Sequence, residues 1–191
     1  MSNQLLARAA VASLLLSITL GPRQAMAQQA GLSADSSFIA TAGSLGLLQV
    51  KLGKLAQDKG SSPSVKDFGS RMVADYSKAN AQLAAGAKQA AFPAPVLQRP
   101  EQQLFDLVSR TGRSSFDKKF MAQIVKQDAE TVRLFQQEAE HGRVASLKRL
   151  ASDMLPTVQQ HLSLATQTAG SVGADVTASA GGQADGRTGG Q

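Results

Sequence analysis

The segment from residue 121 to residue 139 carries the clearest pattern of apolar positions in the chain. Read in alternating steps of four and three residues, one face of this segment consists of Met121, Val125, Asp128, Val132, Phe135 and Ala139. That spacing is typical of a helix that buries one face against its neighbours. Asp128 is the only polar residue on the face, and a buried carboxylate needs a hydrogen-bond partner, a proton or a metal ion. The pattern therefore predicts a packed helix and a polar partner for Asp128 on another helix.

Similar spacing recurs in three other segments and predicts four long helices in all. Their expected ranges, set by capping and helix-breaking residues, are 35–60, 63–90, 114–142 and 144–168, with Asp35 among the candidate caps of the first. Glycines 43, 46 and 53 are expected to permit close helix approach. Segment 92–100 holds three prolines and is expected to cross between helices, before a short helix at 101–110. The predicted fold class is all-α, an antiparallel four-helix bundle with one extra short helix.

The first 27 residues have the composition of a secretory signal peptide. Arg8 precedes an apolar run at 9–20, which is too short to span a bilayer, and a small-x-small cleavage pattern ends at Ala27. The sequence therefore predicts a signal peptide at 1–27, cleaved after Ala27, with retention as an uncleaved anchor as the alternative. A helical bundle at 33–168 and a disordered, Gly- and Ala-rich tail at 169–191 complete the expected organisation.

Composition excludes several classes of function. The chain has no Cys, which excludes disulfides, thiolate metal sites and cysteine nucleophiles. Lys and Arg number 20 against 14 Asp and Glu, and loss of residues 1–27, with two Arg and no acid, would leave 18 against 14. These basic residues are dispersed, so no nucleic-acid partner is predicted. The sequence also lacks a Gly-rich phosphate loop, a His-Glu-x-x-His motif and a Gly-x-Ser-x-Gly elbow, so no catalytic residue is assigned.

Each long helix carries one polar residue on its apolar face, near the middle of the helix. In chain order these residues are Gln49, Tyr76, Asp128 and His161. Helix midpoints meet at one level in an antiparallel bundle, so the four side chains are predicted to form one buried layer, with Asp128 accepting a hydrogen bond from His161. The layer has two interpretations: a hydrogen-bonded network that fixes helix register, or a site for a single transition metal held by all four residues. The network is preferred, and no cofactor is predicted, because buried polar groups usually satisfy one another.

The chain also resembles a known family in three segments within about residues 35–166, which are FIATAGSLGLLQVKLGKLAQDKGSSPSVKDFGSRMVADYSKANAQL, SSFDKKFMAQIVKQDAETVRLFQQEAEHG and LKRLASDMLPTVQQHLSLA. They are similar to the exported, ferritin-like bacterial proteins grouped as domain of unknown function 4142. The resemblance implies a ferritin-like four-helix bundle with an extra short helix, located in the periplasm or outer envelope, and implies no particular reaction. Proteins of that family commonly have Glu at the position of Gln49 and His at the positions of Tyr76 and Asp128. At the position of His161 this chain has the residue that is common in the family. If those family residues bind metal, the resemblance implies that this chain has lost or rebuilt most of the site.

These observations favour a non-enzymatic, exported protein of the bacterial periplasm or outer envelope with a stress-related or interaction role. Its partner would be an unknown envelope protein or a second copy of the chain, and the mature chain would have no transmembrane segment. The alternative is a metal-binding or metal-dependent redox protein that uses Asp128 and His161.

Overall fold

The computed structural model describes the backbone of residues 22–176 and the side chains of residues 34–176. This part of the chain forms five α-helices: α1 (Pro22–Lys59), α2 (Pro63–Gln89), α3 (Arg99–Ser109), α4 (Arg113–His141) and α5 (Ala145–Ser171). No β-strand occurs within these residues, so the all-α fold class is confirmed. The long helices and the short α3 fall close to the predicted ranges, except at the start of α1.

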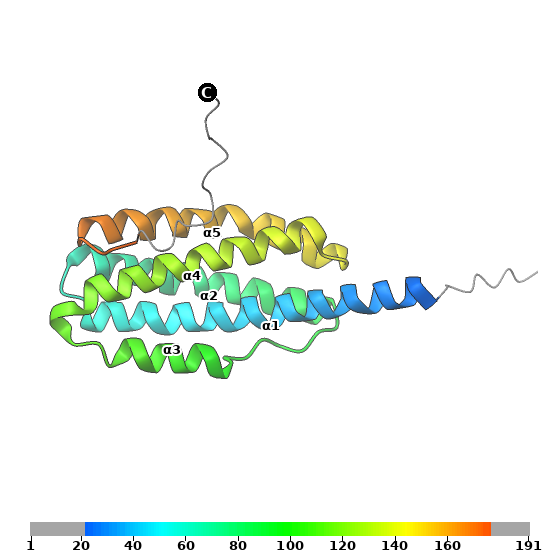
Figure 1. The fold of residues 1–191 in the computed structure, drawn as a ribbon, viewed down its shortest axis with the longest axis horizontal. Helices are drawn as coiled ribbons and strands as arrows, with labels where there is room; N and C mark the ends of the chain where they lie inside the picture. The colour runs from blue at the N-terminus through cyan, green and yellow to red at the C-terminus, as the bar shows by residue number, and fades with distance from the viewer. Residues whose placement is uncertain (1–21, 177–191) are drawn as a thin grey trace, which may run out of the picture.

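The four long helices lie side by side, as Figure 1 shows. They form two hairpins, α1 with α2 and α4 with α5, which meet through contacts of α1 with α4 and of α2 with α5. α2 and α4 run in the same direction, so the chain has to cross back between them. The proline-containing connection and α3 make that crossing along α1, which is the long helix that α3 contacts most.

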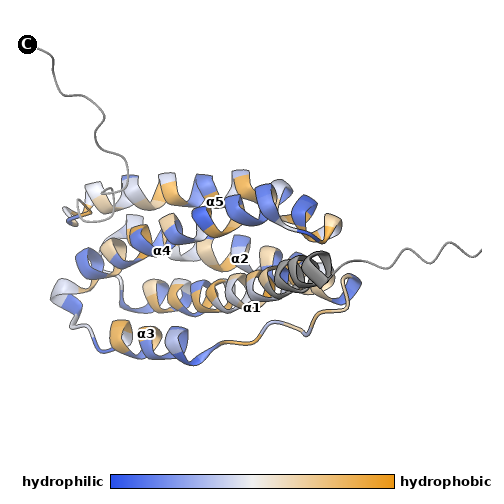
Figure 2. Ribbon diagram, turned by 45° about the vertical axis from the view of Figure 1, so that its right-hand side comes forward, coloured by the Kyte–Doolittle hydropathy of each residue, from blue (hydrophilic) through white to orange (hydrophobic). Residues whose placement is uncertain are grey.

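The interior is built from one apolar face of each long helix. Hydrophobic and hydrophilic residues alternate along every helix in Figure 2, as expected when each helix buries a single face. The largest fully buried apolar side chains are Phe116, Phe120, Ile39, Leu48, Leu52, Met72, Leu83, Met121, Ile124 and Leu147. Within the described residues, no helix has the length and apolar character needed to cross a membrane.

Two boundaries differ from the predicted ones. α1 begins at Pro22 rather than near Asp35, and the predicted cleavage point after Ala27 falls inside this helix. At the other end, α5 continues to Ser171, and the side chains of Val172 and Ala174 pack against the core, so the helical domain extends beyond residue 168. Residues 1–21 of the predicted signal peptide and residues 177–191 of the predicted tail lie outside the described residues.

Each hairpin contains one aspartate that binds the backbone of the turn in the other hairpin. Asp35 on α1 is fully buried and accepts hydrogen bonds from the backbone N–H groups of residues 143 and 144, at 2.9 and 2.8 Å. Asp117 on α4 accepts them from the backbone N–H groups of residues 61 and 62, at 3.0 and 2.7 Å. Asp35 precedes residue 61 by the same number of residues as Asp117 precedes residue 143. The two hairpins are therefore equivalent halves that cap each other, and Asp35 does not cap its own helix as the sequence suggested.

Glycine allows α1 and α2 to approach closely, as the sequence predicted for Gly53. A Cβ atom on Gly53 would lie 2.7 Å from the carbonyl oxygen of Gly69, and a Cβ atom on Gly69 would lie 2.7 Å from that of Gly53. Gly46 faces Asn80 of α2 without room for a side chain, whereas Gly43 faces Pro95 in the connection between α2 and α3 rather than a helix. Since the obstacle between α1 and α2 is backbone, neither helix can accept a methyl group there without moving away.

We therefore expect Gly69→Ala to lower the free energy of unfolding by about 1–3 kcal/mol, because the added methyl group forces α1 and α2 apart. Urea denaturation measures this loss. Gly170→Ala is the matched control, since Gly170 also lies in a helix but a Cβ atom added there would have nothing within 4 Å. That control should be neutral or stabilising by up to about 1 kcal/mol, and an equally neutral Gly69→Ala would contradict the close approach.

Candidate functional site

The buried layer is centred on Asp128, which is fully buried on α4. Its Oδ1 atom accepts a hydrogen bond of 2.7 Å from the Nε2 of Gln49 on α1 and one of 3.1 Å from the hydroxyl of Tyr76 on α2. Both donors are themselves buried, with exposed fractions of 1% and 6%. One carboxylate oxygen thus joins three helices in the interior, and these three predicted residues do converge.

His161, the fourth predicted residue, lies beside Tyr76 but has a different hydrogen-bond partner. Its ring is 4.9 Å from the ring of Tyr76 between centroids, and its side chain is buried on α5. The expected hydrogen bond to Asp128 is not formed, because His161 Nε2 lies 2.9 Å from Oδ2 of Asp75. Asp75 precedes Tyr76 on α2 and has a side chain that is 38% exposed, so the imidazole is directed toward the surface.

Sequence reasoning missed Asp75 because it lies off the apolar face of α2. The available signal was its spacing from Arg71, four residues earlier on the same helix, whose Nε lies 3.5 Å from Oδ2 of Asp75. Such a pair fixes the position of a carboxylate at the surface. Next to an inward Tyr76, a fixed carboxylate is a natural partner for an imidazole on the neighbouring helix.

Burial keeps the layer close to electrical neutrality. Loss of water raises the pKa of Asp128 from 3.8 to about 7, although the hydrogen bonds from Tyr76 and Gln49 lower it. Burial first, and then the negative charge of Asp128, raise the pKa of Tyr76, so its phenol keeps its proton and acts as the donor. Burial lowers the pKa of His161 from 6.5, while the hydrogen bond to Asp75 opposes that shift.

Three buried atoms of the layer have no hydrogen-bond partner among the described residues: Gln49 Oε1, Asp128 Oδ2 and His161 Nδ1. A buried acceptor without a donor is costly, which favours the protonated form of the neighbouring acid. A proton on Asp128 would supply a donor in a region where the Gln49 carbonyl oxygen has none. Below about pH 7 the layer is thus a neutral acid held by an amide and a phenol.

The donor set does not fit a transition-metal centre. Oδ1 of Asp128 already accepts two hydrogen bonds, Gln49 presents its N–H group to that oxygen, and Tyr76 keeps its proton. A metal ion would be left with one carboxylate oxygen, one imidazole nitrogen and the weakly coordinating amide oxygen of Gln49, a poorer ligand set than the usual transition-metal sites supply. In the described part of the chain, no group of three or more His, Asp or Glu side chains is placed to hold a metal ion.

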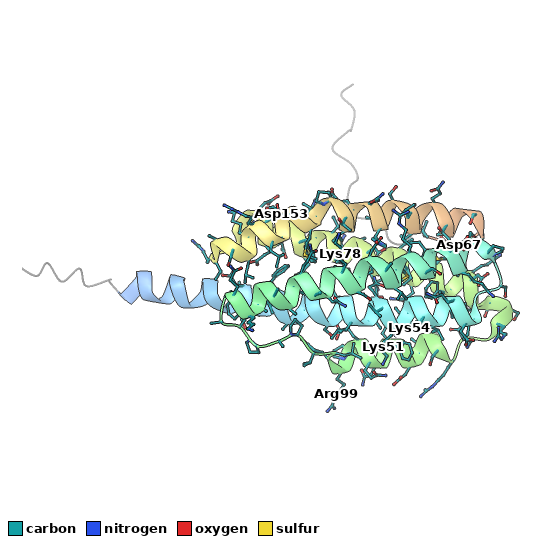
Figure 3. The ribbon with its side chains drawn as sticks, turned by 180° about the vertical axis from the view of Figure 1, so that it is seen from behind. Lys51, Lys54, Asp67, Lys78, Arg99 and Asp153 are labelled. Atoms are coloured by element: carbon teal, nitrogen blue, oxygen red, sulfur yellow. The ribbon has the colours of Figure 1, made fainter. Side chains whose placement is uncertain are left out.

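A cleft of about 360 Å³ between α2 and α5 borders the layer on its exposed side. Asp75, Tyr76 and His161 line its inner wall, and the charged residues around it include Lys78 and Asp153, which Figure 3 places on neighbouring helices. Charges of both signs thus surround the cleft. It gives solvent access to Asp75, whereas Asp128 remains fully buried.

Comparison with known proteins identifies one family. The family model described as "Domain of unknown function (DUF4142)" matches residues 21–168, which is most of the chain. No curated protein matches the chain significantly. No solved structure matches it significantly either.

The raised pKa of Asp128 makes stability depend on pH. Between pH values of about 4 and 7 the folded state binds more protons at Asp128 than the unfolded state does, so the free energy of unfolding falls as the pH rises and levels off above pH 7. His161 has the opposite effect below about pH 6.5: its pKa is lowered on folding, so its contribution to the free energy of unfolding rises with pH. The effect of Asp128 is therefore isolated as the difference between the wild type and Asp128→Asn.

We expect the free energy of unfolding of the wild type, measured relative to that of Asp128→Asn, to fall by a few kcal/mol between pH 4 and pH 7, since one pKa unit corresponds to about 1.4 kcal/mol. Urea unfolding at several pH values measures it. Asp153→Asn, at an exposed position on α5, serves as the control for the removal of a surface carboxylate. A flat difference for Asp128→Asn would mean that the layer holds a charged carboxylate throughout.

Proposed function

The chain belongs to the domain of unknown function 4142 family, and on this basis we propose that it is a non-enzymatic, exported helical-bundle protein of the bacterial envelope. In this proposal the fold is a ferritin-like antiparallel four-helix bundle with α3 as the extra helix. The Gln49–Asp128–Tyr76 network serves to fix the register of the helices. The physiological task is then one of structure or interaction, in response to stress or with an envelope partner or a second copy of the chain.

The observation that carries the proposal is the single oxygen, Oδ1 of Asp128, that accepts hydrogen bonds from α1 and α2 together. Sliding either helix by one turn would move its donor about 5.4 Å along the axis and leave the donor buried without an acceptor. Apolar residues tolerate such slippage far better, because one methyl group can replace another. A buried polar contact of this kind is the best-attested device for setting helix register.

A non-enzymatic role is supported by how the polar groups are used. Asp128 is sealed from solvent, and the phenol of Tyr76 is engaged as a hydrogen-bond donor. His161 is paired with Asp75 through Nε2, and no serine or threonine hydroxyl of the described residues is hydrogen-bonded to its ring. These groups stabilise one another rather than standing ready for a substrate.

Export is supported by the sequence of the first 27 residues. The apolar run, the break at Gly21 and Pro22, and the small residues ending at Ala27 follow the order of a cleavable signal peptide. The absence of Cys is compatible with an oxidising compartment, where a helical interior needs no disulfide. The proposed location is the periplasm or outer envelope, with cleavage after Ala27.

The second candidate function is metal binding or metal-dependent redox chemistry at Asp128 and His161. The observation in its favour is that Asp128 Oδ2 and His161 Nδ1 are both buried without a partner in the same layer. Against it stands the small donor set described above, so we rank it below the register function.

A set of substitutions tests the register function. Asp128→Ala should lower the free energy of unfolding by about 2–4 kcal/mol, because it leaves the donors of Gln49 and Tyr76 buried without an acceptor. The triple variant Gln49→Leu/Tyr76→Phe/Asp128→Leu removes donors and acceptor together and should recover most of that loss. It should nevertheless show poorer dispersion in its amide NMR spectrum and increased binding of a hydrophobic dye, since its register is no longer unique.

Asp153→Ala, an exposed substitution on α5, controls for general effects of losing a carboxylate. A triple variant that is stable and also has native NMR dispersion would show that the network does not set the register.

Protein recovered from its native compartment tests export and the metal candidate together. We expect the mature chain to begin at Gln28, as read by N-terminal sequencing or intact mass. Elemental analysis of the same sample should find no iron, copper, zinc or manganese near one equivalent. A near-stoichiometric metal that disappears in an Asp128→Ala/His161→Ala variant would favour the second candidate, and an intact N-terminus would exclude cleavage after Ala27.

A further inference from the structure

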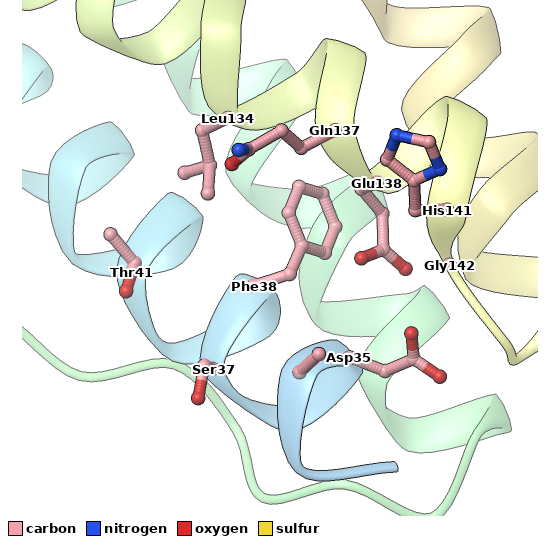
Figure 4. Close-up of a pocket in the computed structure, with 10 residues that line it drawn as sticks. Asp35, Ser37, Phe38, Thr41, Leu134, Gln137, Glu138, His141 and Gly142 are labelled. Atoms are coloured by element: carbon pink, nitrogen blue, oxygen red, sulfur yellow. The ribbon is translucent and has the colours of Figure 1, made fainter. Parts of the chain in front are cut away.

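A second cleft, of about 380 Å³, lies between α1 and α4 beside the turn that joins α4 to α5. It is separate from the layer around Asp128, and Figure 4 shows the residues that line it. Its walls are largely apolar, with Phe38 and Leu134 among them, and two carboxylates, Asp35 and Glu138, lie at one end. Its volume falls within the range of small-molecule sites in proteins.

The two carboxylates differ in how well they are satisfied. Both oxygens of Asp35 accept backbone hydrogen bonds from the α4–α5 turn. Glu138 has an exposed fraction of only 5%, and its Oε1 has no hydrogen-bond partner among the described residues. Figure 4 shows the carboxylate of Glu138 directed from α4 toward Asp35 on α1, next to the ring of Phe38. Glu138 is thus a carboxylate in the wall of the cleft that is not fully satisfied within the chain, and a proton or a cationic donor that enters the cleft can supply what it lacks.

We propose that this cleft binds the ammonium group of a small alkylamine, with the ammonium between Glu138 and Asp35 and the alkyl chain against Phe38 and Leu134. An alkylammonium ion supplies three N–H donors and a positive charge to the unpartnered oxygen of Glu138. Its methylene groups suit the apolar walls, and the aromatic ring of Phe38 adds a favourable surface for a cation. The proposal is independent of the register function of the Asp128 layer.

A divalent metal ion fits the cleft less well than an organic cation. Calcium takes six to eight oxygen ligands, and magnesium requires an octahedral set. The cleft offers two carboxylates, of which Asp35 is already used by the backbone, and the rest of its lining is mainly apolar. The surroundings therefore match a ligand with one charged end and one apolar end.

Binding should depend on pH, because a proton competes with the ammonium ion for Glu138. Burial first, and then the neighbouring Asp35, raise the pKa of Glu138 from 4.5 to about 7. The titratable groups that line the cleft with it are Asp35 from α1 and His141 from α4, and His141 lies 3.6 Å from the exposed Glu140; residue 143 in the turn contributes a backbone N–H to Asp35. Below about pH 7 Glu138 holds a proton and shares it with Asp35, whereas above it the pair is free to take a cation.

The test is titration of the full chain with n-butylamine hydrochloride at pH 8 and constant ionic strength, followed by NMR shift changes. We expect saturable binding in the millimolar range, as befits a ligand of five heavy atoms. Glu138→Gln keeps the shape of the side chain and should weaken binding at least tenfold. Glu140→Gln, an exposed neighbour on the same helix, should leave binding unchanged.

Further arms separate the contributions of charge and apolar contact. Binding to the wild type at pH 5.5 should also be at least tenfold weaker than at pH 8, and n-butanol should not compete. Phe38→Leu should weaken binding severalfold while leaving the protein folded, so the result does not depend on Glu138→Gln alone. Absence of saturable binding by the folded wild type, equal binding by Glu138→Gln and Glu140→Gln, or displacement of butylammonium by stoichiometric Mg²⁺ would each overturn the proposal.

Discussion

The structure depends on the removal of one carboxyl group, that of Asp128, from water. Dehydrating a carboxylate costs more than any single hydrogen bond returns, so the interior has to supply several compensations together. It supplies an amide N–H from α1, a phenolic O–H from α2 and a pKa raised to about 7. Because these donors come from different helices, satisfying the acid and setting the relative positions of the helices are the same event.

The reciprocal caps solve a related problem at the ends of the helices. The backbone N–H groups of a turn between two helices have no partner within either helix, and here Asp35 and Asp117 each supply a carboxylate to the two residues that precede the second helix of the opposite hairpin. Each hairpin is thus completed by the other. Together with the hydrogen bond from Gln49 to Asp128, these contacts hold glycine-containing α1, which has a low intrinsic preference for helix, at Asp35, at Gln49 and at the turn that follows the helix.

Helical periodicity predicted the elements well because it reports directly on which face of a helix is buried. The same argument placed Gln49, Tyr76, Asp128 and His161 in one layer, since each interrupts an apolar face. It failed for partners that lie off those faces. Asp75 is half-exposed and Asp35 resembled an ordinary N-cap, yet the first binds His161 and the second binds a turn distant in sequence. Glu138 was also missed, although it continues a row of buried positions on α4 at seven-residue steps from Ile124 and Thr131.

Asp128 and Glu138 lie on the same helix and both have a pKa raised to about 7, but their surroundings assign them different chemistry. The charge of Asp128 is opposed mainly by lost hydration, and two neutral donors already occupy its Oδ1, so little remains for an outside ligand. The charge of Glu138 is opposed by lost hydration and by a second acid, and its Oε1 has no donor among the described residues. A neutral donor relieves the first situation, whereas in the second a proton or another cation supplies the missing donor and also removes the repulsion between the two acids. The difference between a structural acid and a binding acid on α4 therefore follows from what each one faces, rather than from how deeply it is buried.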